Sequence, residues 1–166
     1  MIPFAPKGFT LIELLVVIAI IGILAGIVLV SLGNARQKGA DAGIQGNLDS
    51  IRTQAEVYAN NNGYVYGTQA IDLPTTAGAA CGSAGMWADP TISQATKAAT
   101  NSGGSATLQG FSNRIAVCFS TSNFWALAVV LKTDPTKLWC VDSNGKANTI
   151  NVSSIDASSG ETFVGC

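Results

Sequence analysis

The chain contains no histidine among its 166 residues. This absence excludes Ser-His-Asp triads, Cys-His dyads and zinc sites with histidine ligands. No nucleophile beside a base, no paired carboxylates and no glycine-rich phosphate loop stand out either. The turn from Asp142 to Gly145 is only faintly similar to a calcium loop, because the downstream glutamate is missing. We therefore expect no enzyme activity, no cofactor and no metal site.

Charge is also scarce. Charged residues make up 11% of the chain, against about 25% in typical soluble proteins. Much of the deficit lies in residues 8–35, where Glu13 is the single ionisable side chain. The net charge of −1 gives no basis for nucleic-acid binding through the electrostatic field.

Proline is missing between Pro6 and Pro74, so nothing in this interval forces a helix to end. Leu14 to Val30 contains no polar side chain, and with its flanks this run reaches the ~20 residues that span a bilayer as a helix. Beyond it, an apolar stripe at helical spacing is formed by Ile44, Leu48, Ile51, Ala55 and Tyr58. We expect one helix from about Thr10 to about Asn60, half membrane-spanning and half amphipathic.

Glu13 is the anomaly of this helix. A carboxylate near a bilayer core costs about 2.5–3.5 kcal/mol on insertion scales and usually has a partner. A membrane anchor needs no such group, so Glu13 is predicted to have a function. A cleaved secretory signal with a site near Ser31 to Ala35 is the competing interpretation; the long apolar core and Glu13 itself argue against it.

The four cysteines are Cys81, Cys118, Cys140 and Cys166, and none forms a C-x-x-C pair. Their even number and wide spacing favour two disulfides in an oxidising compartment over free thiols in the cytosol. Three connectivities are open, of which closure of the short loops in sequence order is weakly preferred. Oxidised cysteines place the C-terminal part outside the cytoplasm and the N-terminus inside.

The rest of the chain predicts an antiparallel sheet. Residues 64–108 are loop-rich, with a short helix capped by Asp89 and begun by Pro90. Strand-like runs follow at residues 114–120, 124–131, 138–141 and 149–152. The expected fold class is α+β, a long N-terminal helix packed on a C-terminal antiparallel sheet of three or four strands.

The stretch KGFTLIELLVVIAIIGILA resembles the start of type IV pilins, in which a short basic leader ends in Gly and is followed by Phe. Lys7, Gly8, Phe9, Thr10 and Glu13 match this pattern, and the likeness is dense over about 25 residues. The resemblance implies cleavage after Gly8 by a prepilin peptidase, methylation of the Phe9 amine and packing of the helices into a filament core. It also implies a disulfide that closes a C-terminal loop, which suits Cys140 and Cys166.

This resemblance suggests four segments: a leader (1–8), a transmembrane and filament-core helix (9–33), its amphipathic half (34–62) and a globular head (63–166). Pilin helices often carry a proline in the apolar part, which this chain lacks. Gly22, Gly26 and Gly33 are the available flexible points, since each glycine costs about 1 kcal/mol in a helix.

The expected function is that of a structural pilus subunit, a homo-oligomer that contacts the peptidase, the assembly machinery and the inner membrane before it becomes extracellular. Glu13, Phe9 and Thr10 are the candidate residues for assembly and register. A pseudopilin of a secretion or DNA-uptake machine, a minor adhesin at the filament tip and a membrane-tethered binding domain or hydrolase remain as alternatives.

Overall fold

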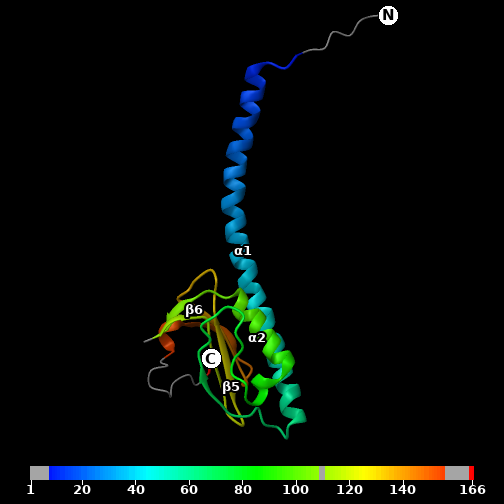
Figure 1. Cartoon of the computed structure of the whole chain (residues 1–166), viewed down its shortest axis with the longest axis vertical. Helices are drawn as coiled ribbons and strands as arrows, with labels where there is room; N and C mark the ends of the chain where they lie inside the picture. The colour runs from blue at the N-terminus through cyan, green and yellow to red at the C-terminus, as the bar shows by residue number, and fades with distance from the viewer. Residues whose placement is uncertain (1–7, 109–110, 156–164) are drawn as a thin grey trace, which may run out of the picture. The chain divides into compact units, whose positions relative to one another are not determined.

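A computed structural model describes residues 8–108, 111–155 and 165–166. The chain divides into two compact units, Met1–Arg36 and Gln37–Cys166. Helix α1 (Leu11–Asn61) runs through both of them (Figure 1). Its bounds confirm the prediction of one uninterrupted helix from about Thr10 to about Asn60.

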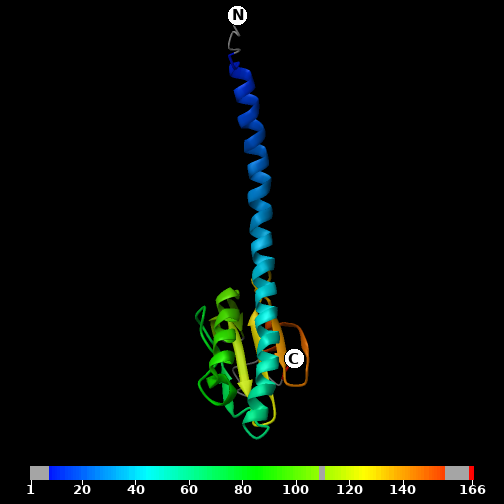
Figure 2. The ribbon, with the colours of Figure 1, turned by 90° about the vertical axis from the view of Figure 1, so that its right-hand side faces the viewer.

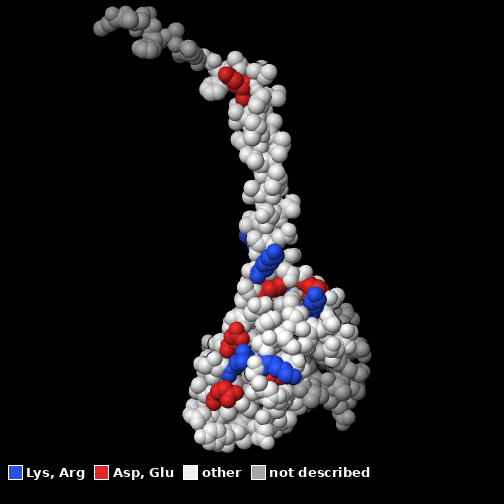
Figure 3. Space-filling model, turned by 180° about the vertical axis from the view of Figure 1, so that it is seen from behind, with Lys and Arg blue, Asp and Glu red and all other residues white. Residues whose placement is uncertain are grey.

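The first unit presents a bare apolar surface. Its large apolar side chains between Leu11 and Leu32 are all at least 48% exposed. Figure 3 shows this stretch almost without charged side chains. Within the described residues, α1 is the one helix long and apolar enough to cross a membrane.

The second unit is built on a five-stranded antiparallel sheet of order β1-β4-β5-β6-β7. Its strands are β1 (Gln69–Asp72), β4 (Ala116–Ser120), β5 (Trp125–Val130), β6 (Lys137–Asp142) and β7 (Ala147–Asn151). A separate pair joins β2 (Ala106–Leu108) to β3 (Phe111–Arg114). The remaining elements are α2 (Pro90–Ser102) and two short 3₁₀ helices, η1 (Gly85–Ala88) and η2 (Val152–Ser154).

The α+β class is confirmed, whereas the expected count of three or four strands is wrong. The four strand-like runs became β4 to β7, and β1 adds a fifth strand from the region expected to be loop. Its sequence, QAID, has a single β-branched residue, and its pairing with β4 shifts register between Gln69 and Asp72. A strand so short and irregular leaves little pattern to detect.

Two apolar clusters cover the two faces of the sheet. The second half of α1 and helix α2 lie over the same face (Figure 2), where Trp125, Leu127 and Val129 of β5 point toward them. The alternate residues, Ala126, Ala128 and Val130, belong to the cluster on the other face. This alternation follows from the two-residue period of a strand.

The apolar stripe of α1 is confirmed for Ile44, Leu48, Ile51 and Ala55, which are all fully buried. Tyr58 is only partly buried, and Ala59 takes the buried position instead. The period of 3.6 residues allows a step of either three or four, and the smaller side chain lies in the core here.

The end of α1 and the start of α2 follow the expected capping chemistry. Gly63 adopts φ +73° after the last turn of α1, and the Tyr64 amide donates to the Ala59 carbonyl at 2.7 Å, as in a Schellman motif. Asp89 caps α2 by accepting from the amides of Thr91 and Ile92 at 2.9 and 3.1 Å. Helix α2 then runs from Pro90 to Ser102.

Asp41 is a carboxylate on the buried face of α1. Its side chain is 8% exposed and accepts hydrogen bonds from the Lys132 amide at 2.6 Å and from the Thr133 amide at 3.2 Å. The Thr133 hydroxyl donates to the same carboxylate. This residue therefore fixes the β5–β6 loop to the helix.

Asp41→Asn is expected to lower the free energy of unfolding by about 1–3 kcal/mol, because an amide nitrogen cannot accept and leaves one loop N–H without its partner. Denaturant unfolding of the full chain in detergent, followed by tryptophan fluorescence, measures the change. Asp49→Asn, an exposed change on the same helix, is the matched control and should stay within about 0.5 kcal/mol. Equal stabilities of the two variants would contradict the role of Asp41.

Candidate functional site

The candidate site lies at the start of helix α1, in the first unit. Lys7 falls outside the described residues. Gly8, Phe9 and Thr10 precede the first helical residue, and the Phe9 side chain is 89% exposed. The peptide bond between Gly8 and Phe9 thus lies in non-helical backbone.

Thr10 and Glu13 form a reciprocal pair at this helix end. The Thr10 amide and the Thr10 hydroxyl both donate to Glu13 Oε2 at 2.8 Å. In return, the Glu13 amide donates to the Thr10 hydroxyl at 3.3 Å. This is a capping box, with Thr10 at the N-cap position and Glu13 three residues later.

The sequence interpretation recognised Glu13 as an anomaly but missed this intramolecular partner. The signal that would have revealed it is Thr-x-x-Glu immediately before an apolar run, the usual capping-box pattern. A negative side chain in the first turn is also favourable toward the helix dipole. Glu13 therefore has a local structural reason to be present besides any role in assembly.

The surroundings of Glu13 are otherwise apolar. A shallow groove of about 420 Å³ on this helix is lined by Glu13 together with Phe9, Ile12, Val16 and Val17. The carboxylate is fully exposed in the single chain. Any cover that buries these apolar neighbours must also supply a partner for Glu13 or bury an unpaired charge at high cost.

The other predicted residues lie elsewhere. Helix α1 stays α-helical across Gly22, Gly26 and Gly33, with no side chain close to any of them; their flexibility stays a prediction. In the second unit, Cys81 pairs with Cys118 and Cys140 pairs with Cys166. This is the connectivity in sequence order.

Among the described residues, no group of three or more carboxylate or thiol side chains is placed to hold a metal ion. The turn after β6 instead uses Asp142 internally: its Oδ1 accepts from the amides of Asn144 and Lys146 at 2.9 and 3.1 Å. The interpretation of residues 142–145 as a turn is confirmed.

Comparison with known proteins gives two matches. Residues 5–29 match the prokaryotic N-terminal methylation motif. Over 66 residues the chain is 42% identical to PilA4, the major component of the type IV wide pilus of Thermus thermophilus. The match covers 39% of this chain and spans half the length of that relative. No solved structure matches the chain.

Proposed function

We propose that this chain, whose N-terminal part is similar to a type IV pilus component and carries the N-terminal methylation motif, is the structural subunit of a type IV pilus filament rather than an enzyme. It is made as a precursor anchored in the cytoplasmic membrane with its N-terminus inside. Prepilin peptidase cleaves after Gly8, the Phe9 amine is methylated, and the assembly machinery moves the subunit into an extracellular homo-oligomer.

The observation that supports this proposal most is the single carboxylate in a long, exposed, apolar helix. Burial of apolar surface contributes roughly 25 cal/mol per Å², so the exposed side chains from Leu11 to Leu32 favour lipid or other helices over water. Lipid alone satisfies the apolar residues. Contact with other copies would give the charge of Glu13 a use beyond the capping box.

The capping box orients the carboxylate for such a contact. Both Thr10 donors engage Oε2, which leaves Oε1 for a further donor. Cleavage after Gly8 would create a positive amine on Phe9, one helical turn before Glu13. In the filament we expect Glu13 to meet the Phe9 amine of a neighbouring copy. The negative carboxylate and the positive amine then compensate each other only when the two helices have the correct axial offset. A paired buried charge of this kind specifies register more than it adds stability.

A testable consequence of this proposal concerns processing of the precursor. The mature chain is expected to begin at Phe9 and to carry a methylated amine, because residues 5–29 match the methylation motif. Intact mass spectrometry of protein from sheared surface filaments measures both features at once. A chain that begins at Met1, or after a site near Ala35, would rule out the pilin role.

The same preparation separates the alternatives. A pilus subunit is the main component of long sheared filaments, whereas a pseudopilin stays in the cell envelope and shares only the processed N-terminus. A minor tip adhesin would be substoichiometric in the filaments. A tethered binding domain would remain monomeric in the membrane fraction after processing.

A further inference from the structure

A polar groove lies in the second unit, between helix α1 and the turn that joins β6 to β7. Its volume is about 610 Å³, within the range of ~300–1,000 Å³ that is usual for small-molecule sites. Asp49, Arg52 and Glu56 line it from the helix, and Ser143 and Asn144 line it from the turn. Figure 3 shows that charged side chains of both signs gather on this unit.

The walls of the groove are held by hydrogen bonds within the chain. Arg52 Nη2 donates to the Gly145 carbonyl at 3.0 Å, which ties the helix to the turn. Asp142, only 1% exposed, accepts from two amides of the turn and from the Cys166 amide at 3.2 Å. The groove is therefore preformed.

Trp125 lines the groove and is fully buried. Its indole Nε1 is itself buried, next to the Tyr66 side chain. Tyr66 packs edge-on against it, with 6.4 Å between ring centroids, and donates its hydroxyl to Glu56 Oε1 at 2.8 Å.

The charges of the groove are already compensated inside it. Asp49 lies 3.5 Å from Arg52, Glu56 accepts from Tyr66, and Asp142 is occupied by backbone amides. Each of these three carboxylates thus already has a partner within the chain, which disfavours a cation as the ligand. An anion would meet three carboxylates, and an apolar ligand would leave the polar groups without water.

The remaining hydrogen-bonding capacity of the lining consists of donors on Arg52 and Asn144 and acceptors on Asp49 and Glu56. Hydroxyl groups both donate and accept, so a neutral ligand that carries several of them matches this lining. We propose that the groove between α1 and the β6–β7 turn binds a saccharide unit.

Ligand-observed saturation-transfer NMR on the full mature chain tests this proposal. The detergent is zwitterionic, because maltoside or glucoside detergents would themselves supply sugar. The probes are methyl glucopyranoside, methyl mannopyranoside and N-acetylglucosamine, each added singly. Saturation transfer to at least one probe is expected, and its absence for all three overturns the proposal.

The variant carrying both Asp49→Asn and Glu56→Gln keeps the shape of the groove and the Tyr66 acceptor but weakens its charged hydrogen bonds. It should bind the same probe at least ~10-fold more weakly. Asp134→Asn, at an exposed carboxylate that does not line the groove, is the matched control and should bind as wild type does. Asn144→Ala replaces the double variant if the latter unfolds more easily. Unchanged binding in the folded variant, or equal loss in the control, refutes the assignment; filament assembly does not enter the readout.

Discussion

Glu13→Leu should insert into the membrane at least as well as the wild type, yet give at least ~10-fold fewer filaments when it is the sole pilin species. Insertion improves because a carboxylate that costs about 2.5–3.5 kcal/mol near the bilayer core is replaced by an apolar side chain. Assembly fails because the Phe9 amine of a neighbouring copy would be buried without its partner. Membrane fractionation and a sheared-filament assay measure the two effects separately.

Two further variants separate the charge of Glu13 from its role in the capping box. Glu13→Gln keeps an oxygen that accepts from Thr10 but removes the charge, so it should assemble as poorly as Glu13→Leu. Thr10→Ala removes the cap, worth about 0.5–2 kcal/mol, but keeps the carboxylate and should lose much less assembly.

If Thr10→Ala reduced filament assembly more than Glu13→Gln does, Glu13 would serve only to begin the helix. Normal filament yield from Glu13→Leu would refute the register role altogether. Loss of membrane insertion in that variant would show that the carboxylate acts at an earlier step than assembly.

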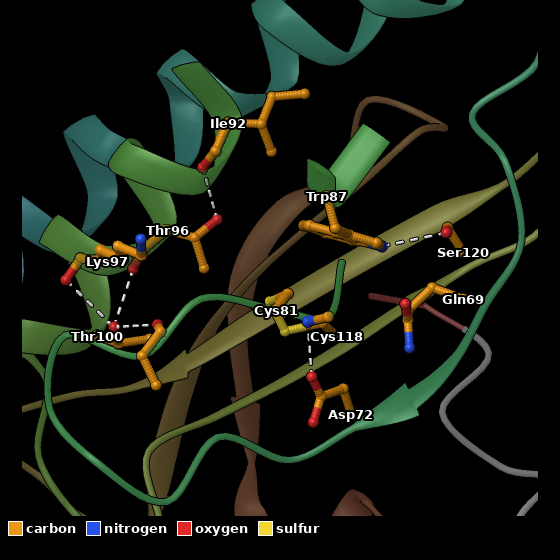
Figure 4. The surroundings of a disulfide bond; sticks show 12 residues. Gln69, Asp72, Cys81, Trp87, Ile92, Thr96, Lys97, Thr100, Cys118 and Ser120 are labelled. Carbon is orange, nitrogen blue, oxygen red and sulfur yellow. Dashed lines mark hydrogen bonds between the residues drawn. A yellow bond between two sulfur atoms is a disulfide. The ribbon is translucent and has the colours of Figure 1, made fainter. Parts of the chain in front are cut away.

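Removal of the Cys81–Cys118 disulfide by paired Cys→Ala changes is expected to cost about 3–4 kcal/mol of unfolding free energy. The bridge closes a loop across 37 residues, and loop-closure entropy of the unfolded chain sets this magnitude. Both cysteines are buried (Figure 4). Around them, the Trp87 indole donates to the Ser120 hydroxyl at 3.1 Å, and Asp72 accepts from the Gly82 amide at 2.6 Å.

The matched control is removal of Cys140–Cys166, which closes 26 residues and has a similar entropic contribution. Cys166 is half-buried, so the cavity left there should be less costly and the total loss smaller. Denaturant unfolding of each variant gives the ranking, and non-reducing peptide mapping of the exported wild type establishes the pairing. Alkylation of all four thiols without reduction would contradict both bridges and the extracytoplasmic location.

Helix α1 and strands β4 to β7 could be predicted because each carries a long pattern of its own. The helix combines an apolar run with a stripe and no proline, and the strands are β-branched or aromatic over several residues. Strand β1 lacks such a pattern and exists only because β4 offers it an edge. Asp41 was also unpredictable, since a carboxylate on a helix is normally solvated and its loop partners are more than 90 residues away.

The two candidate sites also differ in how far the sequence could predict them. Glu13 could be singled out because a charge in an apolar run is visible in the sequence, although Thr10 was not recognised as its partner. The groove could not be foreseen, because Arg52 meets Gly145 across 93 residues of chain. Contacts of that separation depend on the fold as a whole rather than on local pattern.

The edge strands of the five-stranded sheet affect how copies of the chain behave at high local concentration. An exposed strand edge is a template on which another chain can pair, and such pairing leads to aggregates. Here one edge, β1, is short and irregular in register, and the other, β7, consists largely of Asn, Thr and Ala. Neither edge favours fusion of one sheet with the next. Copies held at high local concentration can therefore touch and separate again without their sheets merging.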